Sequence, residues 1–235
     1  MPDQPPTPPS GNPATPTPSS PRPRNDQDAQ IANDISGSLH VIKLLQNDAT
    51  IRTPLVPRGF DTQKINTGQA LQTAAQAGFN ERQAAMGEQE QCSQNLNDAV
   101  GAARLAYADF RKTVTTVYKS RGQRTALGCT GKVPADLEEF ITVATASYTT
   151  ARTQPFQAGL QPSGYPAATL DANLAALTQI GVLREKQRKA IADAVGATSR
   201  RNGAYDSLME WVRQLRGIGT VAFRNQPEQA NKLDF

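Results

Sequence analysis

Two groups of basic side chains are the residues of this chain best suited to binding chemistry. The first group surrounds the end of a predicted long helix and consists of Arg111, Lys112, Lys119, Arg121 and Arg124. The second group flanks a predicted turn and consists of Arg184, Lys186, Arg188, Lys189, Arg200 and Arg201. Such side chains could contact an anionic partner such as nucleic acid, provided that the two groups converge in space. Charged helix faces are more often simply solvated, and the only aromatic residues nearby, Tyr118 and Phe223, are too few for a base-stacking surface.

The sequence offers no set of residues for metal or nucleophilic catalysis. His40 is the single histidine, which leaves a ferritin-like di-iron site without its ligands and a hydrolase relay without its base. Cys92 and Cys129 bracket a predicted helix about 40 Å long. The short return segment cannot span that length, so we expect two free thiols. We therefore predict no catalytic residues, no cofactor and no metal ion.

One glycine-containing segment, residues 128–132, resembles the end of a phosphate-binding loop. The leading glycine of that motif is replaced by Ala126, and the hydroxyl residue after its lysine is replaced by Val133. No hydrophobic strand precedes the segment. We interpret it as an ordinary loop between helical units.

The beginning of the chain has the composition of a disordered tail. The first 24 residues hold ten of the 17 prolines and almost no aliphatic side chains, so they cannot bury enough apolar surface to offset their ordering entropy. We predict a Pro-rich tail over residues 1–27. No signal peptide or membrane span is visible, and a cytoplasmic location is our default expectation.

Apolar residues at helical spacing predict an all-α fold for the rest of the chain. One seam, with steps of four and three, consists of Leu96, Val100, Ala103, Tyr107, Phe110, Val114 and Val117. A second consists of Ala204, Leu208, Trp211, Leu215, Ile218 and Ala222. We expect one helix from Thr62 to Met86, ended by Gly87, and a turn at residues 195–198. The prediction is two tandem antiparallel helical-bundle units of about three helices each, over residues 28–132 and 133–235.

The two halves of the sequence resemble each other. Ile42 aligns with Tyr148 at an offset of 106, Phe60 with Tyr165 at 105, and Phe110 with Trp211 at 101. The shrinking offset predicts about four extra residues in the first half, within residues 87–94. Internal repetition of this kind indicates one structural unit used twice.

Three functions are compatible with these features. A non-catalytic structural or protein-interaction module, with an unidentified protein partner, agrees best with the paired helical units and the missing catalytic set. A binder of nucleic acid or another polyanion through the basic helix ends is the alternative, and steep salt dependence would identify it. An enzyme or small-ligand carrier would need an apolar pocket with convergent polar groups between the helices.

Overall fold

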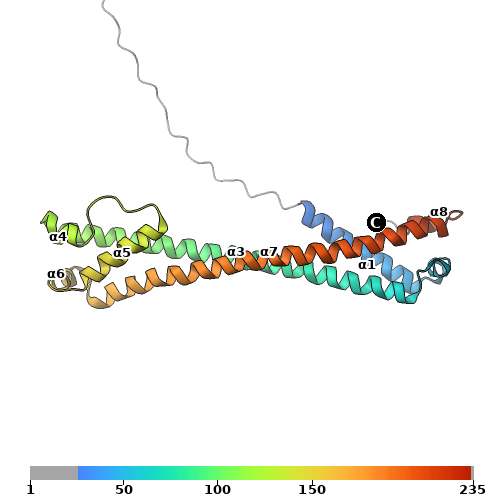
Figure 1. Ribbon diagram of the computed structural model, residues 1–235, viewed down its shortest axis with the longest axis horizontal. Coiled ribbons are helices and arrows are strands. Elements are labelled where there is room, and N and C mark those ends of the chain that lie inside the picture. Colours follow the sequence, from blue (N-terminus) through green and yellow to red (C-terminus); the bar gives the residue numbers. More distant parts are fainter. Residues whose placement is uncertain (1–25, 234–235) are drawn as a thin grey trace, which may run out of the picture. The chain divides into compact units, whose positions relative to one another are not determined.

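The computed structural model describes residues 26–233, and all regular elements within them are helices (Figure 1). The predicted all-α fold is confirmed. The predicted tail lies outside the described residues, apart from its last two, which open the first helix. The elements are α1 (Asp26–Asn47), α2 (Ala49–Arg52), η1 (Val56–Arg58), α3 (Thr62–Val117), α4 (Arg121–Ala126), α5 (Leu137–Ala151), α6 (Phe156–Leu160), η2 (Gln161–Ser163), α7 (Ala167–Ala222) and α8 (Pro227–Asn231).

Side-chain caps explain where two of the longer helices begin. The Asp61 carboxylate accepts a hydrogen bond of 2.9 Å from the Lys64 N–H in the first turn of α3. The Asp136 carboxylate accepts an equivalent bond of 2.9 Å from the Glu139 N–H in α5. Each bond satisfies a backbone donor that has no partner within the helix.

Both long helices are unbroken, which corrects the prediction of six helices. Helix α3 continues through Gly87, and α7 continues through residues 195–198, where we predicted a turn. A glycine inside a helix costs only about 1 kcal/mol relative to alanine. Side-chain packing along two 56-residue helices outweighs that penalty.

Contacts between residues divide the chain into two compact units. One comprises the described parts of Met1–Ile65 and Leu215–Phe235, and the other comprises Asn66–Gln214. The boundary predicted between residues 132 and 133 falls inside the second unit.

The first unit contains α1, α2, η1 and α8 with the beginning of α3 and the end of α7. Its core includes Phe60 and Phe223, both of which are buried. The Leu233 side chain packs over Gly219, where an added Cβ would lie 2.7 Å from the leucine Cδ1. The end of α7 and the short α8 are thereby held together.

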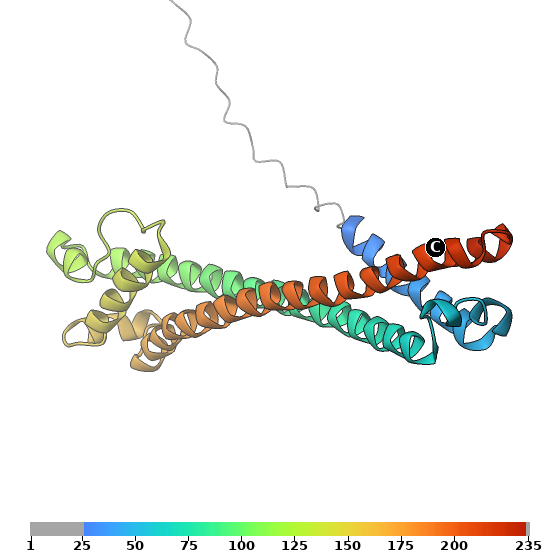
Figure 2. The same cartoon turned by 45° about the vertical axis from the view of Figure 1, so that its right-hand side comes forward.

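The second unit is built on α3 and α7, which run side by side in opposite directions (Figure 2). The Gln187 amide donates a hydrogen bond of 3.1 Å to the Ser93 hydroxyl. Gly68 on α3 lies against Trp211 on α7. Gly78, ten residues later on α3, lies against Arg201, ten residues earlier on α7. Residue numbers therefore fall along α7 as they rise along α3, which defines the antiparallel register.

An aromatic cluster forms the core of the second unit where α5 joins the two long helices. Tyr107 and Phe110 on α3 contact Tyr148 on α5 at ring-centroid distances of 5.8 and 4.9 Å. Phe140 and Tyr165 complete the cluster at 5.8 Å from Tyr107 and 5.3 Å from Phe110. This cluster fixes α5 against the pair.

The order of elements in the first half recurs in the second, and adding 105 to a residue number gives its equivalent. Gly59 and Gly164 share a φ of 89°, in the left-handed region that favours glycine. The N–H groups of the following aromatic residues each donate a bond of 3.2 Å, from Phe60 to the Leu55 carbonyl and from Tyr165 to the Leu160 carbonyl. Helices α3 and α7 then have the same length of 56 residues.

This constant offset corrects two details of the predicted repeat. Because α3 and α7 have equal lengths, the four extra residues expected within 87–94 do not exist. Phe110 is therefore equivalent to Leu215, and both are fully buried. Trp211 is equivalent to Ala106. The predicted alignment of Phe110 with Trp211 is shifted by four residues, which is one helical turn. Because both seams repeat with steps of four and three, such a shift still pairs apolar residues with apolar residues.

Candidate functional site

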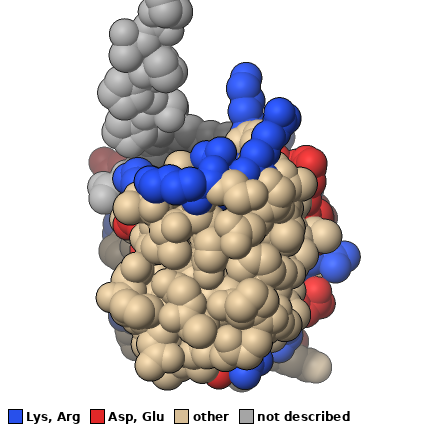
Figure 3. All heavy atoms as spheres, turned by 90° about the vertical axis from the view of Figure 1, so that its left-hand side faces the viewer, with Lys and Arg blue, Asp and Glu red and all other residues tan. Residues whose placement is uncertain are grey.

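The first basic group lies in the second unit, where α3 ends and α4 follows. Figure 3 looks onto the side that Figure 1 places at the left, and Lys and Arg side chains gather along its upper rim, above an area of uncharged residues. Helix α4 lies at this rim in Figure 1. The exposed members of the group are Lys112, Lys119 and Arg121. Arg111 and Arg124 are half-buried.

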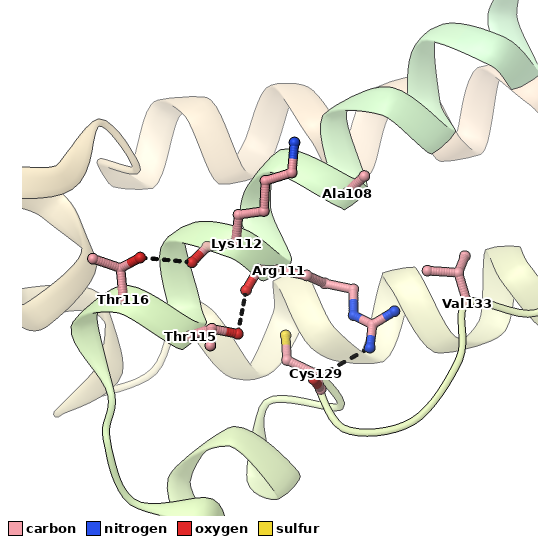
Figure 4. A pocket seen from close by; sticks show the side chains of 7 residues that line it. All are labelled: Ala108, Arg111, Lys112, Thr115, Thr116, Cys129 and Val133. Atoms are coloured by element: carbon pink, nitrogen blue, oxygen red, sulfur yellow. Dashed lines mark hydrogen bonds between the residues drawn. The ribbon is translucent and has the colours of Figure 1, made fainter.

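Arg111 uses its charge within the fold. Its Nη2 donates a hydrogen bond of 3.2 Å to the carbonyl oxygen of Cys129 (Figure 4). The same Nη2 donates a hydrogen bond of 2.6 Å to the carbonyl oxygen of Gly131. The loop of residues 128–132 thus turns backbone acceptors toward a cation. Gly128 and Gly131 have φ values of 64° and 86°, which explains the glycines without any phosphate ligand.

Arg104 has a similar role, although it is not among the cations singled out from the sequence. Its guanidinium donates to the carbonyls of Pro134 at 2.7 Å and Ala135 at 2.8 Å, and it lies 4.5 Å from the centroid of the Phe140 ring. Arg104 and Arg111 are one heptad apart, so they lie on the same face of α3. Their heptad spacing is the sequence feature that could have identified Arg104. Together the two arginines hold the segment that leads into α5.

An open pocket of about 430 Å³ lies beside Arg111 (Figure 4). It is lined by Ala108, Arg111, Lys112, Thr115, Thr116, Cys129 and Val133. The Thr115 and Thr116 hydroxyls donate to helix carbonyls at 2.9 and 3.0 Å, and Lys112 forms an ion pair of 3.2 Å with Asp109. Most polar groups of this pocket are therefore already engaged in local interactions.

The Cys129 thiol is not an activated nucleophile. It is buried, and its Sγ lies 3.3 Å from the Leu127 carbonyl oxygen. Burial raises the pKa of this thiol to about 11, although the nearby Arg111 acts in the opposite direction. The thiol is protonated at neutral pH, and Cys92 and Cys129 are both free, as predicted.

Most of the second basic group is engaged in interactions along α7. Arg200 donates to both carboxylate oxygens of Glu81, at 3.2 and 2.6 Å. Arg184 pairs with Glu138, and Arg188 pairs with Glu185. Arg201 is buried and donates to the Asn202 side chain, whereas Lys186 and Lys189 are exposed.

The two basic groups do not form one surface. Gln187, which lies between Lys186 and Arg188, contacts Ser93. Ser93 and Arg111 lie on the same helix α3, so helical rise separates this part of the second group from Arg111 by about 27 Å. That distance exceeds the Debye length at physiological salt several-fold. Three cations of the first group, Lys119, Arg121 and Arg124, form no ion pair within the described part of the chain. In the second group the same holds for Lys186 and Lys189.

A second pocket, of about 300 Å³, lies between α3 and α7. It is lined by Ala99, Ala102, Ala103, Ala106, Tyr148, Asn173, Ala176, Leu177 and Gln179. Tyr148 is 1% exposed, and its hydroxyl has no hydrogen-bond partner among the described residues. Burial raises the pKa of this phenol well above its usual value. The sequence does not predict this pocket, because its alanines have the same spacing as core residues.

The remaining candidate features are the single histidine, metal-binding groups and membrane-spanning helices. His40 is exposed on α1. Residues 26–233 contain no group of three or more side chains suited to holding a metal ion. None of the helices in that range has both the length and the apolar character needed to cross a membrane.

Comparison of the chain with protein-family models, curated proteins and solved structures gives no match.

Proposed function

We propose that this chain is a non-catalytic interaction module, a helical unit used twice, whose α3–α4 end binds an acidic partner protein. The observation that carries the proposal is the group of Lys119, Arg121 and Arg124, whose side chains form no ion pair with the described residues. The buried Nε of Arg124 also has no hydrogen-bond partner there. Cations left without counter-charges are available to an external carboxylate.

The duplication supports this proposal by providing an internal comparison. Helix α4 is equivalent to α8, because each short helix follows a 56-residue helix after a few residues. Helix α4 carries two arginines, whereas α8 carries one acidic residue, Glu228, and no basic residue. Equivalent positions in the two repeats thus differ in charge, and the difference favours a specific role for α4.

The tandem character of the fold belongs to the same proposal. Equal lengths of α3 and α7, matched turns at Gly59 and Gly164, and burial at equivalent positions support one ancestral unit. In each compact unit, the opening helices of one repeat combine with the closing helix of the other. The repeats therefore exchange elements instead of forming two separate bundles over residues 28–132 and 133–235.

Charge reversal at α4 tests the proposed binding end. The variant Lys119→Glu/Arg121→Glu/Arg124→Glu is compared with Lys186→Glu/Arg188→Glu/Lys189→Glu, which makes the same charge change on α7. Fluorescence anisotropy measures binding of labelled poly-L-glutamate to the full chain at low salt. We expect at least about tenfold weaker binding for the α4 variant and less than about twofold change for the α7 control.

Equal binding by the two variants would refute the α4 end as the binding surface. A labelled DNA duplex is titrated in parallel, because nucleic acid is the alternative partner. Tighter binding of DNA than of poly-L-glutamate, with a steep loss as salt rises, would favour the polyanion function. The few aromatic residues near α4, Tyr118 and Phe156, contact each other at 5.6 Å, which leaves them poorly placed for base stacking.

A further inference from the structure

The alanine-lined pocket between α3 and α7 has a filled equivalent in the other repeat. The constant offset of 105 gives the residues of the other repeat that are equivalent to its lining. On α3, Ala103 is equivalent to Leu208 and Ala106 to Trp211. On α7, Asn173 is equivalent to Gly68 and Leu177 to Gln72. The equivalent pair Trp211 and Gly68 is in direct contact. One repeat thus holds an indole ring at a position where the other holds only the methyl group of Ala106.

The contrast between Trp211 and Ala106 indicates the shape of a ligand that would fit the pocket. Trp211 is 2% exposed, and its ring lies so close to Gly68 that an added Cβ would overlap it. At the equivalent place, Ala106 and its neighbours leave a pocket of about 300 Å³. A bicyclic aromatic ring has the dimensions that this fold already accommodates once, at Trp211.

The polarity of the pocket restricts the occupant further. None of its lining residues is charged, and six of the nine are alanines or leucine from the two long helices. Tyr148 lines it from α5, and the Tyr148 hydroxyl is buried without a hydrogen-bond partner among the described residues. A buried hydroxyl without a partner is unfavourable, and a ligand group that pairs with it would be preferred.

We propose that this pocket binds a small neutral bicyclic aromatic molecule with one N–H donor, of which indole is the simplest. Its ring lies against the alanines of α3, in the space that the Trp211 ring fills in the other repeat. Its N–H donates a hydrogen bond to the Tyr148 hydroxyl oxygen. The site is independent of the proposed binding end at α4.

Indole itself is the probe, titrated into the full chain by isothermal calorimetry. We expect saturable one-to-one binding in the high-micromolar to millimolar range, as befits so small a ligand. The variant Ala106→Trp/Asn173→Gly copies the Trp211 and Gly68 pair into the pocket and should abolish binding. The control Ala84→Trp places a tryptophan at an exposed position of the same helix and should bind indole as the parent chain does.

Two further variants test the details of the site. Ala103→Leu copies Leu208 and should weaken binding at least about tenfold by narrowing the pocket, and it replaces the double variant if that chain fails to fold. Tyr148→Phe removes the hydroxyl and should weaken indole binding about three- to tenfold. It should leave the binding of naphthalene, which has no N–H group, unchanged.

Absence of saturable indole binding to the parent chain would overturn the proposal. So would unchanged binding by a folded Ala106→Trp/Asn173→Gly chain, because indole would then occupy another place. Equal affinity of the parent and Tyr148→Phe chains would refute the hydrogen bond to the Tyr148 hydroxyl.

Discussion

The Trp211 ring on α7 packs directly over the backbone of Gly68 on α3. A Cβ at residue 68 would overlap three atoms of the indole. Close approach of the two helices at this point therefore depends on a residue without a side chain. In the other repeat, Asn173 stands at the position equivalent to Gly68, and Ala106 stands at the position equivalent to Trp211. The close contact between Trp211 and Gly68 is therefore specific to one repeat.

Gly68→Ala should destabilise the chain despite the higher helix propensity of alanine. Overpacking against the ring costs about 1–3 kcal/mol, which exceeds the propensity gain of about 0.5–1 kcal/mol. Gly87→Ala is the matched control, since an added Cβ at residue 87 has nothing within 4 Å. Denaturant titration should show lower stability for the first variant and higher stability, by about 0.5–1 kcal/mol, for the second. Equal effects of the two substitutions would show that the indole does not lie on Gly68.

Trp211→Ala should be strongly destabilising. Trp211 is almost completely buried, and truncation of a buried aromatic side chain costs roughly 3–5 kcal/mol. Exposed Leu105 on α3 provides a control, and Leu105→Ala should change the free energy of unfolding by less than about 0.5 kcal/mol. Equilibrium unfolding in urea measures both variants. A loss of less than about 1 kcal/mol for Trp211→Ala would place the ring at the surface.

Much of the helical framework could be predicted from the sequence, because burial follows helical periodicity. The seam residues Leu96, Tyr107 and Phe110 are buried as their spacing predicts. The continuity of α3 through Gly87 could not be predicted, since it depends on α7, which lies far away in the sequence. A seven-residue period also gives no unique register, so the alignment of Phe110 with Trp211 was wrong by one turn.

The candidate sites were predicted less completely than the helices. Residue type identified Arg111 and Arg200 as cations, but their partners, a loop carbonyl and Glu81, are distant in sequence. The pocket beside Tyr148 forms where alanines of α3 and α7 lie opposite each other. The composition of the chain does not show which alanines do so. Comparison of equivalent positions between repeats requires one offset along the whole of both long helices, and the matching ends of α3 and α7 establish it.

The two cysteine thiols should differ in reactivity. Cys129 is buried with its pKa raised to about 11, whereas Cys92 is half-buried on α3. We expect iodoacetamide at pH near 8 to alkylate Cys92 at least about tenfold faster, because the thiolate is the reactive form. Mass spectrometry of peptides after timed quenching measures both rates. Comparable rates would mean that the loop held by Arg104 and Arg111 opens frequently.

The antiparallel pairing of the two repeats within residues 66–214 can be tested by a designed disulfide. A Cβ added to Gly78 would lie 3.8 Å from the Cβ of Arg201, within the range of about 3.5–4.5 Å found in disulfides. The variant Gly78→Cys/Arg201→Cys is made in a chain with Cys92→Ser and Cys129→Ser. The control Gly87→Cys/Arg201→Cys places the first cysteine about 13 Å further along α3.

The most direct measurement is the electrophoretic mobility of both variants after mild oxidation, with and without reductant. The antiparallel arrangement predicts an intramolecular disulfide in nearly all of the Gly78→Cys/Arg201→Cys chain and little in the control. Failure of that pair to cross-link in a folded chain, or equal cross-linking of the control, would contradict the pairing of α3 with α7 that forms the proposed pocket.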